Sequence, residues 1–160
     1  MSLDALERCI LTALQTAGRM SNVELAQHIG LSESPCLRRV KQLEEAGIIA
    51  GYAAVVDQRK LGLDVTAYVL VTMAKQPDST TEAFHAAVRM EPHIIECHAM
   101  SGSHDYLMKV VAGSMDDFSE LCMQHILKFP GVQHVESSFS LKEIKNSRVL
   151  PTAGKAGMAG

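Results

Sequence analysis

The sequence predicts an α+β chain in which a helix-turn-helix (winged-helix-like) module precedes a ferredoxin-like βαββαβ module. Three observations support this fold class. Segments with helical periodicity fill residues 1–56, a polar break follows at residues 57–63, and β-rich segments then alternate with helical ones. We therefore expect a helix-turn-helix domain over 1–56, a hinge over 57–63 and a second domain over 64–146. Residues 147–160 are Gly- and Ala-rich and lack periodicity, which predicts a mobile tail.

The first two predicted helices have clear patterns. Residues 3–16 carry apolar side chains at intervals of three and four, as expected for a helix with one buried face. The second helix, Asn22–Ile29, follows a capping box, in which Ser21 accepts the backbone N–H of Glu24 and the Glu24 side chain reaches back. Gly30 stands where a helix commonly ends in a left-handed residue.

The third predicted helix runs from about residue 33 to residue 46. Two helices joined by about three to four residues with a Gly in the turn form a helix-turn-helix. The second helix of that motif lies in the DNA major groove, with its N-terminal residues toward the base edges. Ser32 is placed to cap this helix, and Pro35 lies in its first turn, where a missing N–H costs little. The predicted buried stripe consists of Leu37, Val40, Leu43 and Ala46.

The opposite side of this helix supplies the candidate DNA contacts. An Arg side chain can pair bidentately with guanine, and a Ser hydroxyl can bond a base or a phosphate. A solvated charged face on a structural helix is the alternative, but the preceding turn and caps favour a helix that reads double-stranded DNA. The candidate DNA-binding residues are Ser32, Ser34, Pro35, Arg38, Arg39 and Lys41.

Net charge limits how this chain can bind DNA. Residues 1–56 contain five Lys or Arg and six Asp or Glu, and the whole chain of 160 residues has a formal charge of −3. Because overall charge cannot attract phosphates here, binding needs a local basic patch, repeated in an oligomer.

Hydrophobicity and cysteine content argue against a membrane protein, a secreted protein and a zinc protein. No apolar run approaches the roughly 18 residues of a membrane helix, and acidic residues stand where a signal peptide is basic, so we expect a cytoplasmic protein without membrane association. The four cysteines, without any CxxC pair, fit reduced thiols better than disulfides or a zinc site. No cofactor is expected.

The second module has the pattern of a split βαβ sandwich. A strand is predicted over residues 48–56, after the third helix. Beyond the hinge, strands are predicted over 65–74, 94–100, 106–112 and 132–144, and helices over 79–90 and 114–129. The order β-α-β-β-α-β is ferredoxin-like. Since such a sheet has helices on one face only, its other face predicts a dimer formed sheet to sheet.

The sequence gives little support for a metal site or for a catalytic site. A metal site would draw on His93, Cys97, His98 and His104, but neighbouring strand residues such as 97 and 98 point to opposite faces of a sheet. Asp105 and Tyr106 beside His104 suggest acid–base chemistry, yet no nucleophile or second carboxylate is spaced to serve it. We expect neither a metal site nor an enzyme.

Short matching stretches in order make the chain resemble the Lrp/AsnC, or feast/famine, family of bacterial transcription regulators, closest to its leucine-responsive branch. In the first module they lie at residues 21–25, 30–32, 35–37, 39–40, 43–44 and 51–52. In the second module they lie at residues 96–98, 101–102, 105–107 and 127–132, the last with Pro130-Gly131-Val132. Each is weak alone, but together at these spacings they are specific.

The resemblance implies a homodimer that assembles further, often to an octamer, and that binds a free amino acid, Leu or Met, between dimers. The loop that corresponds to the family's effector loop contains Gly102, Ser103, His104, Asp105 and Tyr106. Its backbone amides would hold the carboxylate of the amino acid and Asp105 its ammonium group. Ser137 and Ser138 lie where the family carries a Thr-rich effector segment.

Two departures from the family pattern affect these expectations. The more basic N-terminal extension is missing, which lowers the expected non-specific affinity for DNA. His104 stands where close relatives carry an apolar or aromatic residue, which bears on the choice of ligand. The alternative function is an amino-acid sensor that acts through a protein partner rather than DNA.

Overall fold

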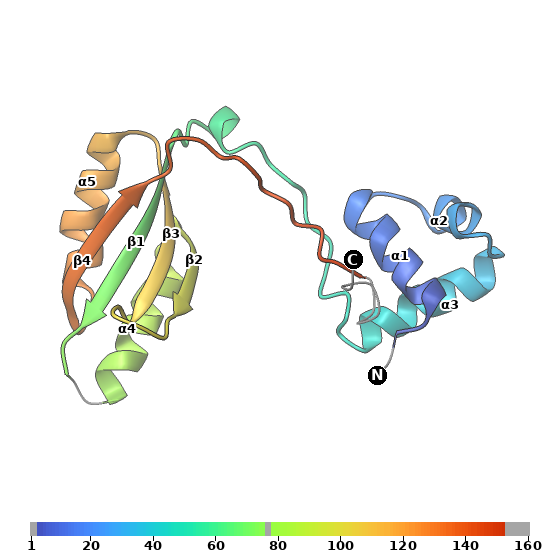
Figure 1. Cartoon of the computed structure of the whole chain (residues 1–160), viewed down its shortest axis with the longest axis horizontal. Helices are drawn as coiled ribbons and strands as arrows, with labels where there is room; N and C mark the ends of the chain where they lie inside the picture. Colours follow the sequence, from blue (N-terminus) through green and yellow to red (C-terminus); the bar gives the residue numbers. More distant parts are fainter. Residues whose placement is uncertain (1–2, 76–77, 153–160) are drawn as a thin grey trace, which may run out of the picture. The chain divides into compact units, whose positions relative to one another are not determined.

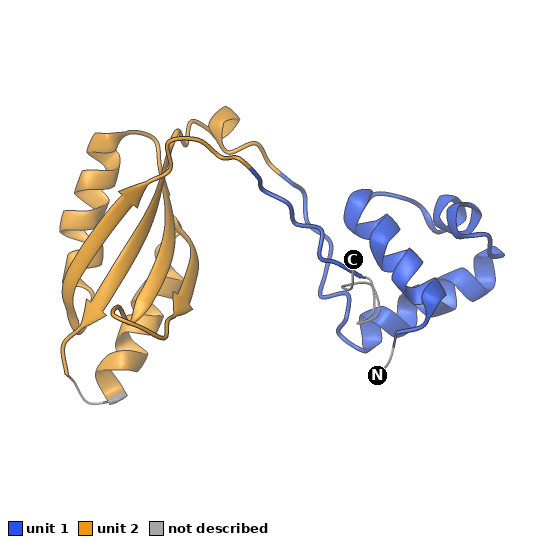
Figure 2. Cartoon of the chain, viewed as in Figure 1, with its two compact units in different colours: residues 1–55, 145–160 blue, residues 56–144 orange. Residues whose placement is uncertain are grey.

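The computed structural model describes residues 3–75 and 78–152 (Figure 1). The chain forms two compact units (Figure 2): residues 1–55 with 145–160, and residues 56–144. The helix-turn-helix is therefore in one unit and the sheet in the other. None of the helices in residues 3–75 and 78–152 could span a membrane.

The first unit is built from α1 (Ala5–Thr16), α2 (Asn22–Ile29) and α3 (Glu33–Glu45). The capping box of Ser21 and Glu24 is confirmed, and Gly30 ends α2 with a φ of 73°, in the left-handed region that favours glycine. Ser32 precedes α3, but its side chain makes no capping hydrogen bond. The core of the unit consists of Ile10, Leu11, Ala13, Leu25, Ala26, Cys36, Val40 and Leu43.

The predicted buried stripe of α3 is partly wrong. Val40 and Leu43 are buried, but Leu37 is 50% exposed and Ala46 is exposed as well, and Cys36 takes the buried place one turn before Val40. Cys36, Val40 and Leu43 are spaced four and three apart, so they still form one helical face. Burial raises the pKa of the Cys36 thiol.

The prediction of a strand over residues 48–56 is wrong. Residues 48–49 form a bend, residues 50–56 have no regular secondary structure, and no strand among the described residues pairs with them. A β-rich stretch without a pairing partner cannot satisfy its backbone in a sheet. The segment is instead held to α3 at Tyr52, whose hydroxyl donates to the Glu44 carboxylate at 2.9 Å. Burial and this carboxylate raise the pKa of Tyr52 to about 12.

The second unit contains β1 (Val65–Met73), α4 (Asp78–Met90), β2 (Ile94–Ala99), β3 (Tyr106–Ala112), α5 (Met115–Gln124) and β4 (Val132–Phe139). The strands form one antiparallel sheet in the order β2-β3-β1-β4. Residues of α4 and α5 share one core with inward-facing residues of the sheet, so both helices cover the same face. The ferredoxin-like arrangement is thereby confirmed. The short helices η1 (Arg59–Leu61) and η2 (Ile126–Lys128) complete the unit.

Two elements end five residues earlier than the sequence predicts. β4 ends at Phe139 rather than residue 144. Phe139 pairs with Ala67 of β1, and the Ser140 N–H still donates to the Thr66 carbonyl at 2.9 Å, but β1 begins one residue before Thr66, at Val65. The helix predicted over 114–129 ends at Gln124 and is followed by η2. Phe129 is extended, with ψ at 144°, as expected for a residue that precedes a proline.

Candidate functional site

The N-terminal half of α3 presents the candidate DNA-binding side chains to solvent. Ser32, Ser34 and Arg38 are exposed, and Lys41 one turn later is exposed as well. Pro35 is half-buried in the first turn. These exposed residues contain two cations and two hydroxyls on one helix, a set that can contact phosphates and base edges.

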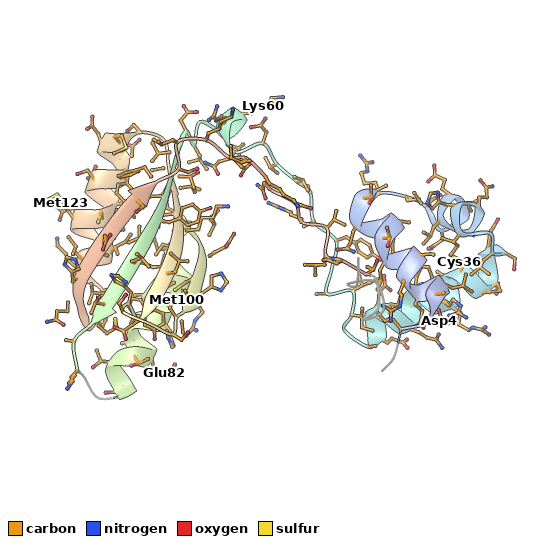
Figure 3. All side chains as sticks on the ribbon, viewed as in Figure 1. Asp4, Cys36, Lys60, Glu82, Met100 and Met123 are labelled. Atoms are coloured by element: carbon orange, nitrogen blue, oxygen red, sulfur yellow. The ribbon has the colours of Figure 1, made fainter. Side chains whose placement is uncertain are left out.

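Arg39 has a different role in the structure. Its Nη1 lies 2.5 Å from Asp4 Oδ2 and 3.7 Å from Glu7 Oε1, and its side chain is only 26% exposed. Asp4 caps α1 in a capping box with Glu7, a signal that the sequence analysis missed although the Asp-x-x-Glu spacing carries it. Figure 3 labels Asp4 at the start of α1. The backbone hydrogen bond from Glu7 and the Arg39 guanidinium hold the pKa of Asp4 below its ordinary value. Arg39 therefore joins α3 to α1.

The candidate effector loop connects β2 to β3 and is fastened to β1. The Asp105 N–H donates to the Val71 carbonyl at 2.9 Å, and Asp105 Oδ2 accepts from the Met73 N–H at 2.6 Å. The Met100 N–H closes the loop on the Asp105 carbonyl at 2.8 Å. Gly102 has a φ of 142°, a conformation that side chains rarely adopt, so glycine is required by the backbone there.

A second contact joins the loop to β4. His104 Nε2 lies 3.6 Å from Glu136 Oε2, and its Nδ1 lies 3.1 Å from Ser103 Oγ. Because His104 is only 23% exposed while Glu136 is 59% exposed, the imidazole is partly covered and the carboxylate faces solvent. Glu136 was not among the residues proposed from the sequence. Only the sheet order, which separates β4 from β3 by a single strand, brings it near the loop.

The remaining effector candidates do not share one face of the sheet. Tyr106 points toward α4: its hydroxyl lies 2.8 Å from His85 Nε2, and its ring centroid lies 4.7 Å from that of Phe84. Burial is the main reason that the pKa of Tyr106 is raised. On β4, Phe139 packs on Phe118 of α5, so Ser137, two residues earlier, is on the helix side.

Ser138 is on the opposite, open face of the sheet. It pairs across the strands with Tyr68 of β1, which is 41% exposed. The structure thus places Gly102, Ser103, His104 and Asp105 together in one loop near Glu136. Tyr106 and Ser137 lie within the layer between sheet and helices, and Ser138 lies outside it.

No metal-binding arrangement accompanies these residues. In residues 3–75 and 78–152, no group of three His, Cys, Asp or Glu side chains could hold a metal ion. His93 and His98 instead lie beside Glu91 and Glu96, at 2.9 Å and 3.6 Å respectively.

Family models match both units of the chain. Residues 66–150 match the Lrp/AsnC ligand binding domain, and residues 3–50 match a winged helix-turn-helix DNA-binding domain. The chain is 38% identical over 148 residues to the leucine-responsive regulatory protein of Salmonella typhimurium, and 36% identical over 147 residues to that of Rhizobium meliloti. The alignments cover 92% of this chain in both cases, and 90% and 94% of the relatives.

Solved structures agree with this match. A transcriptional regulator of Neisseria meningitidis, solved as an L-Met complex, is 43% identical, with a TM-score of 0.91, covering 94% of this chain and 97% of that chain. An AsnC family transcriptional regulator of Agrobacterium tumefaciens is 32% identical, with a TM-score of 0.89 and coverages of 93% and 97%.

Proposed function

Because this chain belongs to the Lrp/AsnC family of DNA-binding transcription regulators, whose second domain binds amino acids, we propose which residues carry each activity here. DNA is read by the start of α3, through Ser32, Ser34, Arg38 and Lys41. The single observation that supports this assignment is their common exposure on the second helix of the helix-turn-helix. Arg39 supports that helix through its ion pairs to α1.

The effector is a free amino acid, with Met first and Leu second. The relative solved with L-Met supports this choice, since it matches nearly the whole chain. The loop amides around Gly102 and Ser103 are the proposed carboxylate site. Asp105 is the proposed partner of the ammonium group, and because its Oδ2 already accepts from Met73, it is held in a fixed orientation.

The proposed assembly is a homodimer that associates further, to an octamer. Both helices of the second unit cover one face of the sheet, which leaves Tyr68, Leu70 and Leu107 on the other. We propose that a second copy covers this open face. The amino acid then acts by binding one arrangement of the assembly more tightly than another, which shifts the population of DNA-binding states. A regulator of this kind is not expected to be an enzyme, and it works where chromosomal DNA is, in the cytoplasm.

Adjacent arginines give a sharp test of the DNA assignment. The probe for fluorescence polarisation is labelled DNA from upstream of the protein's own gene, called the operator DNA below. With this probe, Arg38→Ala should weaken binding by about tenfold or more, since a bidentate base contact is worth about 1–3 kcal/mol. Its melting temperature should stay that of the wild type, because Arg38 makes no ion pair within the described residues. Arg39→Ala is the matched control and should lower thermal stability, through the lost pairs to Asp4 and Glu7.

Two results would contradict the assignment. Unchanged DNA affinity in the folded Arg38→Ala variant would show that this face of α3 does not contact DNA. If the wild type bound no DNA above a scrambled duplex at low salt, while still binding Met, the protein would be a sensor that acts through a protein partner.

A further inference from the structure

The described end of the chain lies against α1 within the first unit. The Gln15 side chain makes two hydrogen bonds to the backbone of Leu150: Nε2 donates to the carbonyl at 3.2 Å, and Oε1 accepts from the N–H at 2.6 Å. Two residues later, Arg8 Nη1 donates to the Thr152 carbonyl at 2.6 Å. The hydroxyls of Thr12 and Thr152 lie 2.7 Å apart.

These contacts come from one continuous face of α1. Arg8, Thr12 and Gln15 are spaced four and three residues apart, so their side chains lie in a row on the helix. An amide side chain that bonds both the N–H and the C=O of one residue satisfies that backbone as a neighbouring strand would. Residues 150–152 are thus held through their main chain, although they form no strand with the sheet.

A cleft lies beside the docked segment. It has a volume of about 370 Å³, and its walls come from α1, from residues 48–52 and from the segment itself. Apolar wall residues include Leu11, Leu14, Ile48, Ile49, Leu150 and Pro151. Leu150 and Pro151 thus lie on one wall of this apolar cleft, but Leu150 stays 72% exposed, so the segment is held chiefly by its three polar attachment points.

We propose that residues 149–152 are a strap that fastens the DNA-binding unit to the end of the amino-acid-binding unit. The chain passes between the two units at residues 55–56 and again at residues 144–145. Docking of the strap on α1 therefore gives the DNA-binding unit a second connection, and a unit held twice has less freedom than one on a single linker.

The strap has a consequence for regulation that rests on the proposed function. It follows β4 in the chain, and β4 carries Glu136 beside His104 of the effector loop. A change at the loop that moves the end of β4 reaches α1 through the strap, in addition to reaching it through the hinge.

A pair of threonines gives the matched test of the strap itself. Thr12 and Thr16 both donate to the carbonyl four residues earlier at 2.9 Å, but only Thr12 meets Thr152. Hydrogen exchange of the full chain is measured by mass spectrometry. Over residues 145–152, the double variant Thr12→Ala/Gln15→Ala should exchange at least about fivefold faster than the wild type. Thr16→Ala should exchange like the wild type. Equal exchange in all three proteins would overturn the strap.

The regulatory role is tested in the same variants. The change in operator affinity caused by Met should be reduced about twofold or more in Thr12→Ala/Gln15→Ala, while calorimetry shows unchanged Met binding, since the effector loop is intact. A full response from a protein whose strap is released would overturn this role. If neither Met nor Leu changes the DNA affinity of the wild type, both the proposed function and the regulatory role of the strap are wrong. Hydrogen exchange still decides whether the strap exists.

Discussion

At the scale of single residues, Glu91 is a buried carboxylate of the second unit that bonds two histidines. It is 9% exposed and follows α4 directly. Its Oε1 lies 2.9 Å from His93 Nδ1, and its Oε2 lies 2.7 Å from His125 Nδ1, so one side chain joins the turn before β2 to the end of α5. Burial alone would raise the pKa of Glu91, but the hydrogen bonds from His125 and His93 outweigh it, and the pKa is lowered.

This lowered pKa predicts a pH-dependent stability. The carboxylate stabilises the folded state above its ordinary pKa of 4.5, and that contribution is lost as the pH falls through the lowered value. Glu91→Gln should reduce the free energy of unfolding at pH 7 by about 1–3 kcal/mol, because charged hydrogen bonds are replaced by neutral ones. It should also flatten the loss of stability below pH 4.5, measured by urea unfolding across a pH series.

Glu82 provides the control for that series. It is 77% exposed and lies 3.9 Å from His85 Nδ1, so Glu82→Gln should unfold like the wild type at every pH. A pH profile of Glu91→Gln that matches the wild type would contradict the role assigned to Glu91.

At the scale of elements, the sequence predicted structure that depends on nearby residues, but not structure that depends on pairing with a distant strand. The Ser21 capping box and Gly30 act within a few residues, so α2 was placed with its observed bounds. Residues 48–56 show that β-propensity alone is insufficient: Val55 and Val56 are exposed, without a paired strand among the described residues. The family resemblance indicated the candidate effector loop, but the neighbourhood of His104 and Glu136 depends on the sheet order, which no local pattern contains.

A change in the candidate effector loop should affect amino-acid binding without affecting DNA binding. Asp105→Ala removes the acceptor for the Met73 N–H and the proposed partner of the ligand ammonium. We expect the binding of Met to weaken by about tenfold or more, as for the loss of a charged hydrogen bond, while DNA binding without the amino acid stays unchanged. Calorimetry with Met and polarisation with operator DNA measure the two quantities.

Ser101 is a suitable control in the same loop, since it is exposed and near Asp105 in the chain. Ser101→Ala should bind Met like the wild type. Wild-type affinity for Met in Asp105→Ala would show that the amino acid binds elsewhere.

At the scale of the whole molecule, the open face of the sheet is the surface through which we propose that the subunits associate. Tyr68 lies near its centre, paired with Lys109 of β3 and Ser138 of β4. Tyr68→Asp would bury an unpaired charge if a second sheet covers this face, which costs several kcal/mol. Light scattering should then report the monomer mass of 17.4 kDa for the variant and a multiple of it for the wild type.

The other side of the unit supplies the control for assembly. Ser119 is exposed on α5, on the helix layer, so Ser119→Asp should leave the dimer intact. A Tyr68→Asp variant that keeps the wild-type mass would show that the subunits associate through another surface.

For the whole molecule, we expect a free amino acid to alter DNA binding by this chain. The most direct measurement is fluorescence polarisation of the wild-type protein with labelled operator DNA over a salt series, without and with Met or Leu. We predict sequence-dependent binding that weakens as salt rises and an apparent affinity that shifts about fivefold or more with the amino acid. Identical binding curves with and without both amino acids, at every salt concentration, would contradict the account.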